Sequence, residues 1–296
     1  MTTSTDSVRD RGGLVVVTGA STGMGAATAR ELAGRGYHVL AGVRREVDAE
    51  TLRGERIEPV ILDITVAADV EAVADRVARD PGRRPLRALV NNAGIAVNAP
   101  VETLPLSEWR AQFEVNLFGH IAMTQALLPA LLDSSGTVVN ISSVGGRVAM
   151  ATYGAYAGSK FALEAVSDAL RRELAGTGVH VVVIEPGAVV TDMADRGIAK
   201  ADDLAAAMTP GQRDRYGALV GAVTAQARTF TRHGVPAARG AQIIATAATA
   251  TNPRTRYTIG RDAAVLVRLA RVLPDWTLDR VARRALKPHY APATTQ

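Results

Sequence analysis

Residues 14–25 have the sequence LVVVTGASTGMG. This stretch begins with four apolar residues and continues with three closely spaced glycines. The apolar run predicts a buried strand, and residues 26–33 have the composition of a helix. Glycines between a strand and a helix let the backbone approach a pyrophosphate, and the helix N-terminus offers unpaired N–H groups and a positive dipole end. The segment therefore predicts a dinucleotide-binding turn.

The rest of the chain alternates apolar, strand-like runs with segments of helical periodicity. We expect further strands at residues 38–43, 59–62, 88–90, 138–141, 179–184 and 257–260, and helices at 66–78, 107–132, 156–174 and 237–250, with Ser107 as a cap. Such alternation is typical of a parallel sheet with its site at the carboxyl ends of the strands. We therefore predict a single-domain α/β protein, a Rossmann-like doubly wound parallel sheet flanked by helices over residues 13–262, after a flexible N-terminus at 1–12.

The composition fits this fold and excludes several kinds of site. Apolar residues make up 47% of the 296 residues, which is enough for a full core. Without cysteine the chain has no disulfide, iron–sulfur cluster or thiolate zinc site. The net charge of +5 comes with dispersed arginines, so we expect no nucleic-acid partner. Residues 1–11 are polar and no run of about eighteen apolar residues follows, so we expect a cytoplasmic location.

A second informative segment runs from Asn140 to Lys160. Its apolar start predicts a strand that delivers Ser142 and Ser143 to the carboxyl end of the sheet, and a helix should follow. Tyr156 and Lys160 are four residues apart, so they lie on one face of that helix. A nearby cation lowers the pKa of a phenol, and a serine hydroxyl can bind a substrate oxygen beside it. The alternative is an ordinary surface pair on an amphipathic helix.

This segment resembles the active site of the short-chain dehydrogenase/reductase family, which has a strand, a serine, Tyr-x-x-x-Lys and a helix. The family's serine lies thirteen residues before its tyrosine and its lysine four after, which selects Ser143, Tyr156 and Lys160. The resemblance implies that Tyr156 exchanges the proton, Ser143 orients the substrate oxygen, and Lys160 lowers the pKa of the phenol and binds the ribose hydroxyls. Tyr153 is then a substrate-wall or packing residue.

The resemblance also gives a catalytic role to Asn116, in Val-Asn-Leu-Phe-Gly within the expected helix at 107–132. The family's fourth catalytic residue occupies this motif and holds a water that is linked to the lysine. The alternative is a buried asparagine bonded at a helix kink, because asparagine competes for backbone hydrogen bonds. His120, one turn later, is expected to be a packing residue.

The second expected strand ends in Arg44-Arg45, where a dinucleotide fold places the residue that selects the ribose. An arginine there suits a 2′-phosphate, so we predict NADP(H) as the preferred cofactor, with NAD(H) as the alternative. Arg44 would otherwise be an exposed charge at a strand end. Thr22 departs from the pattern, because many NADP-using relatives carry a basic residue at its position.

Three more turns match cofactor-binding motifs of the family. Asp63 lies where the family binds the adenine amino group, or else it holds the start of a helix. Asn91-Asn92-Ala93-Gly94 matches the family's turn beside the ribose, and residues 186–191 match the segment that clasps the nicotinamide. The resemblance therefore implies cofactor contacts from Gly19, Ser21, Thr22, Gly23, Met24, Gly25, Arg44, Asp63, Ile64, Asn92, Ala93, Gly94, Tyr156, Lys160, Pro186, Gly187, Val189 and Thr191.

Two regions depart from the core pattern. Residues 192–236 are too long for a simple connection and rich in Ala, Met and Leu, so we predict a mobile helical substrate lid. Residues 263–296 are predicted to form a C-terminal helical extension, with basic amphipathic segments at 265–273 and 278–286. These segments would cover the pocket, pack on a partner subunit or lie on a membrane, and we rank membrane contact lowest.

The expected substrate site is apolar. We predict substrate contacts from Ser143, Val144, Met150, Tyr153 and Met193. Because the lid shows no evident cluster of cations, we expect an apolar alcohol or its ketone or aldehyde, and lower catalytic efficiency when a carboxylate is added. Arg147 would be an anion anchor or, as we prefer, a solvent-facing arginine. The C-terminal half also loosely resembles the hydroxysteroid and retinol dehydrogenase branches of the family, which accept bulky apolar substrates.

The resemblance leads us to predict an NADP(H)-dependent oxidoreductase that requires no metal. One alternative is a 3-oxoacyl reductase that acts on an acyl carrier, and another is a nucleotide-sensing regulator that binds the cofactor without chemistry. The expected helices at 107–132 and 156–174 resemble those that pair between subunits in this family, so we expect a homodimer or homotetramer.

Overall fold

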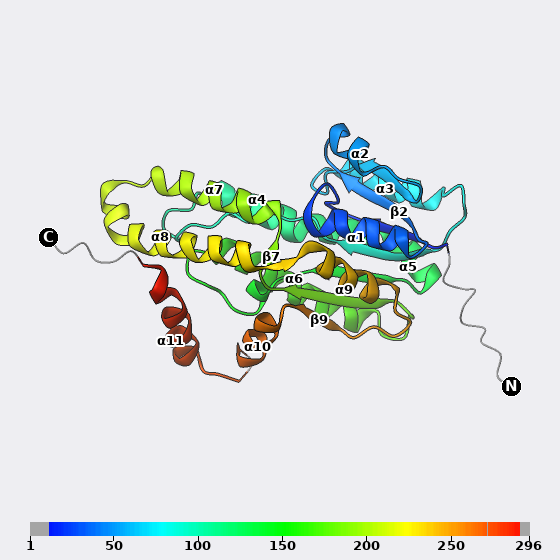
Figure 1. The fold of residues 1–296 in the computed structure, drawn as a ribbon. Coiled ribbons are helices and arrows are strands. Elements are labelled where there is room, and N and C mark those ends of the chain that lie inside the picture. The colour runs from blue at the N-terminus through cyan, green and yellow to red at the C-terminus, as the bar shows by residue number, and fades with distance from the viewer. Residues whose placement is uncertain (1–11, 271, 291–296) are drawn as a thin grey trace.

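The computed structural model describes residues 12–270 and 272–290. Its centre is a seven-stranded parallel sheet in the order β3-β2-β1-β4-β5-β6-β9, with helices on both faces (Figure 1). The strands are β1 Leu14–Val17, β2 His38–Val43, β3 Ile57–Ile61, β4 Leu86–Asn91, β5 Thr137–Ile141, β6 His180–Pro186 and β9 Arg256–Ile259. The doubly wound α/β fold predicted from the sequence is confirmed.

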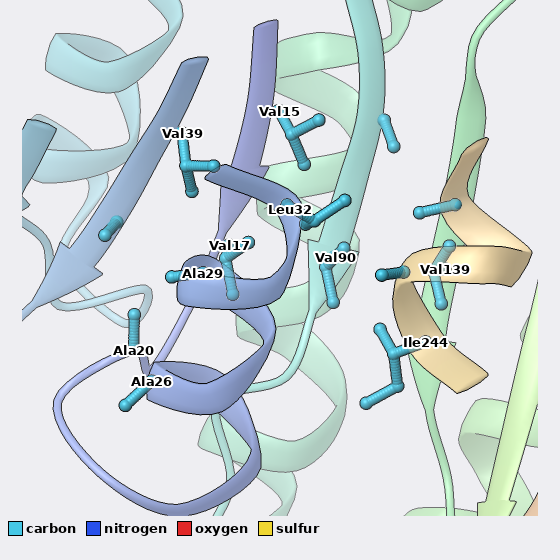
Figure 2. Packing of buried hydrophobic residues seen from close by; sticks show 14 of the residues in the cluster. Val15, Val17, Ala20, Ala26, Ala29, Leu32, Val39, Val90, Val139 and Ile244 are labelled. Carbon is cyan, nitrogen blue, oxygen red and sulfur yellow. The ribbon is translucent and has the colours of Figure 1, made fainter. Parts of the chain in front are cut away.

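One face of the sheet packs against helices α1 (Gly23–Gly34) and α9 (Ala237–Thr249). Val15 and Val17 of β1 point to this face, where they join Leu32 of α1 in a core (Figure 2). Val139 of β5 and Ile244 of α9 extend the same core past the central strand β4. Successive side chains of a strand point to opposite faces of the sheet, so the remaining residues of β1 pack on the other face.

The opposite face packs against α3 (Ala67–Ala78), α5 (Gly119–Ser134) and the end of α6 (Gly154–Glu173). Leu14 and Val16 of β1 lie in this second core with Val73 of α3 and Met123 of α5. Strands that are covered on both faces need apolar residues at every position. This is why β1 reads as an uninterrupted run of Leu and Val.

The third strand starts earlier than predicted. We expected it at residues 59–62, starting at Pro59, whereas β3 runs from Ile57 to Ile61. The difference arises because β3 is an edge strand, and an edge strand tolerates a proline that cannot donate a backbone hydrogen bond. The short helix α2 (Glu46–Leu52), between β2 and β3, was not predicted.

The long helix predicted at residues 107–132 is interrupted. It consists of α4 (Leu106–Phe113), a π-helical turn η1 (Glu114–Phe118) and α5. Ser107 does not cap it, because Pro105 occupies the N-cap position and α4 begins at Leu106. A π turn contains one extra residue, and such turns are frequent at functional sites.

Among the described residues, one helical run, Leu106–Ser134, is long and apolar enough to cross a membrane by length and composition alone. We had expected no such run. Met123, Leu127 and Leu131 of this run are buried in the core against the sheet. Such burial is typical of the core helix of a globular domain, so the run is weak support for a membrane span.

The segment predicted as a lid forms two helices, α7 (Asp192–Ala206) and α8 (Pro210–His233), which extend beyond the sheet together (Figure 1). Short strands β7 (Val189–Val190) and β8 (Val235–Pro236) pair at their base. The helices are present as predicted, and their movement as a lid stays a prediction. The C-terminal part follows as α10 (Arg261–Ala270), α11 (Asp275–Leu286) and a 3-10 turn η3 (Lys287–His289).

Candidate active site

A cavity of about 950 Å³ runs along the carboxyl edge of the sheet and continues beneath α7, α8 and α11. The strand order places β1 between β2 and β4, so the connections after β1 and β4 leave in opposite directions. A crevice at such a reversal is the usual ligand site of doubly wound sheets. All residues predicted to contact the cofactor or the substrate line this cavity, and Asn116 is the one predicted residue outside the lining.

The turn after β1 can accommodate a dinucleotide because its glycines have no side chains to keep a ligand away from the backbone. Gly19 has φ +62°, and a Cβ there would lie 2.7 Å from the Ala93 Cα. A Cβ on Gly25 would overlap the Gly19 carbonyl oxygen and would lie 2.5 Å from Asn92 Nδ2. Thr22 is the N-cap of α1 and makes no side-chain cap bond, so the first-turn N–H groups stay available to an anion.

The turns after β1 and β4 are tied together by hydrogen bonds. Asn92 Nδ2 donates to the carbonyl oxygens of Thr18 and Gly19, each at 3.0 Å. Thr18 Oγ1 accepts the backbone N–H groups of Asn92 and Ala93, also at 3.0 Å. These bonds fix the spacing between the two walls of the crevice.

The two arginines after β2 have different surroundings. Arg45 donates to both carboxylate oxygens of Asp48, at 2.9 and 2.8 Å. Arg44 lines the cavity, and the described part of the chain gives its guanidinium no hydrogen bond or ion pair. The charge of Arg44 helps to lower the pKa of Asp48, but its guanidinium donors stay available to a phosphate at this edge.

Asp63 shows features of both readings proposed for it. It lines the cavity, while its Oδ1 accepts the backbone N–H of Thr65 at 3.0 Å and the Thr65 hydroxyl at 2.7 Å. Its own backbone N–H donates to Asp69 Oδ2 at 2.8 Å. The carboxylate thus holds the turn before α3 in a fixed shape beside the cavity.

Ser143 and Tyr156 face each other at the middle of the cavity. Ser143 Oγ accepts the Gly145 N–H at 3.0 Å. Burial raises the pKa of Tyr156, and a hydrogen bond with Ser143 lowers it in part. The ring of Tyr153 stands edge-on to that of Tyr156, with centroids 6.3 Å apart. A Cβ on Gly145 would lie 3.2 Å from Tyr156 Cε1, so the glycine leaves room for the phenol.

Lys160 is buried, and its Nζ donates to the carbonyl oxygen of Ile141 at 2.8 Å. Burial lowers the pKa of Lys160 to about 8, against an upward contribution from the nearby Glu164. The expected lowering of the Tyr156 pKa by Lys160 is wrong for this arrangement. The reason is that the phenol is itself desolvated, so its pKa rises.

Asn116 lies in the π turn η1 and is fully buried. Its amide accepts the Ile95 N–H and donates to the Ile95 carbonyl, both at 2.9 Å, and it also donates to Ser159 Oγ at 3.1 Å. These bonds match the alternative reading of an asparagine at a helix irregularity. A Cβ on Gly94 would be 3.4 Å from Asn116 Oδ1 and 4.0 Å from Lys160 Nζ, so both side chains lie against the turn at Gly94. Its role in a water relay stays a prediction.

His120 is a buried packing residue, as expected from its apolar neighbours. Its Nε2 lies 2.7 Å from the Ala93 carbonyl oxygen. Burial and the charge of Lys160 lower the pKa of His120 to about 3, so the imidazole is neutral at physiological pH.

A buried charge cluster behind Lys160 was not predicted. Arg256 donates to Glu164 Oε2 at 2.9 Å, and its Nε lies 3.5 Å from Glu185 Oε1. Arg147 lies 3.7 Å from Glu164 and 3.5 Å from Glu185. Arg147 is therefore neither solvent-facing nor an anion anchor, because two buried carboxylates hold it. The one sequence signal was the spacing of Glu164, one helical turn after Lys160.

Helices from outside the sheet line the far end of the cavity, which stays open to solvent at its rim. Leu286 of α11 packs with Val223 and Leu219 of α8 and with Tyr153. Gln226 of α8 also donates to the Ala285 carbonyl at 3.1 Å. Of the three positions weighed for the C-terminal extension, the structure therefore shows α11 covering the pocket.

This end also carries cations, contrary to the sequence reading. Arg196 of α7, Arg283 of α11 and Lys287 of η3 all line the cavity. The sequence gave no sign of this because the three residues are far apart along the chain and only packing brings them to one cavity.

The glycine turn, the available guanidinium of Arg44 and the Ser–Tyr–Lys arrangement define an oxidoreductase that uses a nicotinamide dinucleotide. The family model described as short chain dehydrogenase matches residues 13–201. The chain belongs to the short-chain dehydrogenase/reductase family, whose members are NAD(P)-dependent.

Several curated relatives are similar over most of their length. The chain is 36% identical to mouse retinol dehydrogenase 16 over 286 residues, which cover 94% of this chain and 90% of the relative. It is 34% identical to the Bos taurus dehydrogenase/reductase SDR family member 9, over 89% of this chain and 86% of the relative. It is 32% identical to the NADPH-dependent 3-dehydrocapnine reductase of Ornithobacterium rhinotracheale, over 92% of this chain and 96% of the relative.

Solved structures agree with the fold. A short chain dehydrogenase from Burkholderia cenocepacia in complex with NADP is 26% identical, with a TM-score of 0.71, over 92% of this chain and 97% of that one. A short chain dehydrogenase/reductase from Burkholderia phymatum in complex with NAD is 25% identical, with a TM-score of 0.74, over 88% of this chain and 93% of that one. Both cofactors therefore occur among structures of this shape.

Proposed function

We propose that this protein is an NADP(H)-dependent oxidoreductase that interconverts an apolar alcohol and its ketone or aldehyde. One observation carries the proposal: Ser143, Tyr156 and Lys160 meet in the middle of a cavity with a dinucleotide turn at one end. The other end is walled by side chains of α7, α8 and α11 and has room for a second ligand. The gathering of these three side chains also argues against a sensor that binds the cofactor without chemistry.

Tyr156 and Ser143 would have separate roles in the transfer of the proton. A bound nicotinamide supplies or accepts the hydride at C4. Tyr156 donates a proton to the carbonyl oxygen in reduction and takes it from the alcohol in oxidation. Ser143 Oγ donates a hydrogen bond to the same oxygen and stabilises the charge that develops on it. Burial raises the pKa of Tyr156, so the phenol that would exchange this proton is desolvated.

Lys160 would reach the ribose hydroxyls from the floor of the site. Its ammonium already binds the Ile141 carbonyl at the end of β5, which fixes its position. Pro186, Gly187, Ala188, Val189 and Thr191 line the same cavity and would hold the nicotinamide amide. A Cβ on Gly23 would lie 3.1 Å from Thr191 Cγ2, so this wall meets the dinucleotide turn directly.

The preference for NADP(H) rests on Arg44. A guanidinium whose donors make no internal hydrogen bond can bind a 2′-phosphate through two hydrogen bonds, whereas an uncharged ribose hydroxyl interacts with it only weakly. A relative whose name specifies NADPH and a solved neighbour with NADP are consistent with this choice. The solved structure that contains NAD shows that the fold alone does not determine the choice between the two cofactors.

The apolar substrate rests on the lining of the far end and on the relatives named as retinol dehydrogenases. Met193, Ile198, Val220, Phe230 and Leu286 line this part of the cavity. Burying apolar surface there favours binding by about 25 cal/mol per Å². Two of the similar proteins, from mouse and human, are named retinol dehydrogenase 16.

We further propose that the chain pairs with a second copy through the helices α4 to α6. Leu106 of α4, Phe118 of η1 and Phe161 of α6 are large apolar side chains that are exposed in a single chain. Light scattering on the purified protein would measure the mass directly. A monomer across micromolar concentrations would contradict this proposal.

A panel of ketones and aldehydes graded by apolar size, assayed with NADPH, tests the proposed function. We expect NADPH oxidation whose kcat/KM rises from short aliphatic ketones to bulky ones. Tight binding of NADPH without turnover of any member would contradict the proposal and favour a nucleotide sensor.

A further inference from the structure

The inner face of α11 and η3 combines apolar and cationic side chains. The residues of α11 that line the cavity, Ala282, Arg283 and Leu286, share one helical face, and Lys287 of η3 and Tyr290 after it also line the cavity. Leu286 is buried against α8, so it anchors the face. Arg283 and Lys287 are one helical turn apart and flank this anchor, which places both cations on the cavity side of the helix.

An apolar path connects the reacting end of the substrate site with these cations. Leu286 belongs to the same apolar cluster as Tyr153. The Tyr153 ring is 6.3 Å from that of Tyr156. A substrate whose carbonyl meets Tyr156 would therefore pass Tyr153 and the cluster around Leu286 before it reaches the rim formed by Arg283 and Lys287.

The charges at this rim are not neutralised within the described chain. Arg283 makes one hydrogen bond, from Nε to the Asp279 backbone carbonyl at 3.4 Å, and no ion pair is described for Arg283, Lys287 or Arg196. Asp63, at the dinucleotide end, is the one acidic side chain that the described residues contribute to the lining. Like charges four residues apart on a helix repel each other, and an anion between them would relieve that repulsion.

We propose, on the basis of the proposed function, that the preferred substrate is amphipathic: its carbonyl meets Tyr156, and an anionic group at its distal end is held by Arg283 and Lys287. The distal anion is a carboxylate, sulfonate or phosphate on an apolar body. This replaces the expectation that any added carboxylate lowers catalytic efficiency. A carboxylate close to the carbonyl still fails, because it would lie beside the apolar residues around Tyr153. The mouth of the pocket suits a distal anion, since the cations there stay partly hydrated and need no buried partner.

Two long-chain aldehydes of equal length test this assignment, one ending in a carboxylate and the other in its methyl ester. We expect kcat/KM to be about tenfold higher for the carboxylate, the order of a charge-assisted pair at a partly exposed site. The advantage should come from KM and should shrink as salt is added, because exposed charges are screened.

The double variant Arg283→Gln with Lys287→Gln should remove this advantage, so that the carboxylate and the methyl ester have the same kcat/KM. Arg280→Gln with Arg284→Gln is the matched control, because these arginines lie on the same helix, carry the same charge and do not line the cavity. The control should keep the carboxylate preference. Turnover of the methyl ester shows that each variant is folded.

Equal efficiency with both aldehydes in the unmodified protein would overturn the proposal, as would equal losses in the two double variants. If the proposed function itself is wrong, the result is distinguishable, because neither aldehyde is then reduced. In that case the same comparison is made by calorimetry, with a saturated fatty acid and its methyl ester titrated into the NADPH-loaded protein. A Kd that the lining substitutions leave unchanged would then reject the anionic subsite.

Discussion

The two ends of the cavity are built from different parts of the molecule. The dinucleotide end is made of backbone at the edge of the sheet, with glycines in contact and Asn92 bonded to the carbonyls of Thr18 and Gly19. The substrate end is made of side chains on α7, α8 and α11, which lie outside the sheet (Figure 1). The first end therefore has almost no freedom to change, whereas single substitutions can change the chemistry of the second.

The largest effect should follow from Gly25→Ala, because the new methyl group would overlap the Gly19 carbonyl. We expect NADPH binding to be lost and the free energy of unfolding to fall by about 2 kcal/mol, as in overpacked cores. Gly221→Ala in α8 is the control, since nothing lies within 4 Å of its Cβ position. That change should be neutral or stabilising by up to about 1 kcal/mol. Tight NADPH binding by the Gly25 variant would show that the turn is not the cofactor site.

A smaller effect at the same end is expected from Arg44→Asp. Removing the phosphate partner should weaken NADPH binding by about tenfold to a hundredfold and shift the preference towards NADH. Arg45→Ser is the matched variant and should leave the preference intact, because Arg45 is occupied by Asp48. The Kd values for NADPH and NADH are measured by titration for the unmodified protein, Arg44→Asp and Arg45→Ser. Equal affinities of the unmodified protein for NADPH and NADH would contradict the assignment.

At the substrate end, Leu286→Ala should weaken substrate binding without changing the affinity for the cofactor. The change removes the buried contact of α11 with Val223 and Tyr153, at a cost of about 2 kcal/mol in unfolding free energy. We expect KM for a bulky ketone to rise while the Kd for NADPH stays the same. A parallel loss of NADPH affinity would mean that the two ends are not independent.

The smallest expected effect concerns the stability contributed by Lys160. Burial lowers its pKa from 10.5 to about 8, so between those pH values the unfolded chain holds more protons than the folded one. Stability from this group therefore rises with pH across that window. Lys160→Met should be inactive yet more stable at neutral pH by about 1 to 2 kcal/mol, and the gain should disappear towards pH 10.5. Denaturant titrations at several pH values measure this, and a loss of stability at neutral pH would contradict it.

The same contrast between the two ends explains what the sequence could reveal. Gly19, Gly25 and Arg44 were predictable because each belongs to a short motif on a recognisable strand and turn. The spacing of Tyr156 and Lys160 predicted that they share one face of a helix, and the resemblance to the family selected them as the catalytic pair. The substrate end has no such local pattern, since Tyr153, Leu219 and Leu286 come from three segments that only packing brings together.

Burial explains the two electrostatic errors. Arg147 was read as solvent-facing, because its buried partners Glu164 and Glu185 lie on other elements. The pKa of Tyr156 was expected to fall, because sequence spacing gives its distance from Lys160 but not the water that both groups lose. Desolvation of a charge is a property of the whole fold, so spacing alone cannot predict it.

The assignment of Tyr156 as proton donor is tested most directly by Tyr156→Phe, with Tyr153→Phe as the matched variant. Each change removes one phenol oxygen from the cavity and keeps the ring. For Tyr156→Phe we predict a kcat at least about a hundredfold lower with the same Kd for NADPH, because only the proton-bearing oxygen is lost. Tyr153→Phe should keep most of the activity. Full activity of the Tyr156 variant, or a larger loss from Tyr153→Phe, would contradict the account.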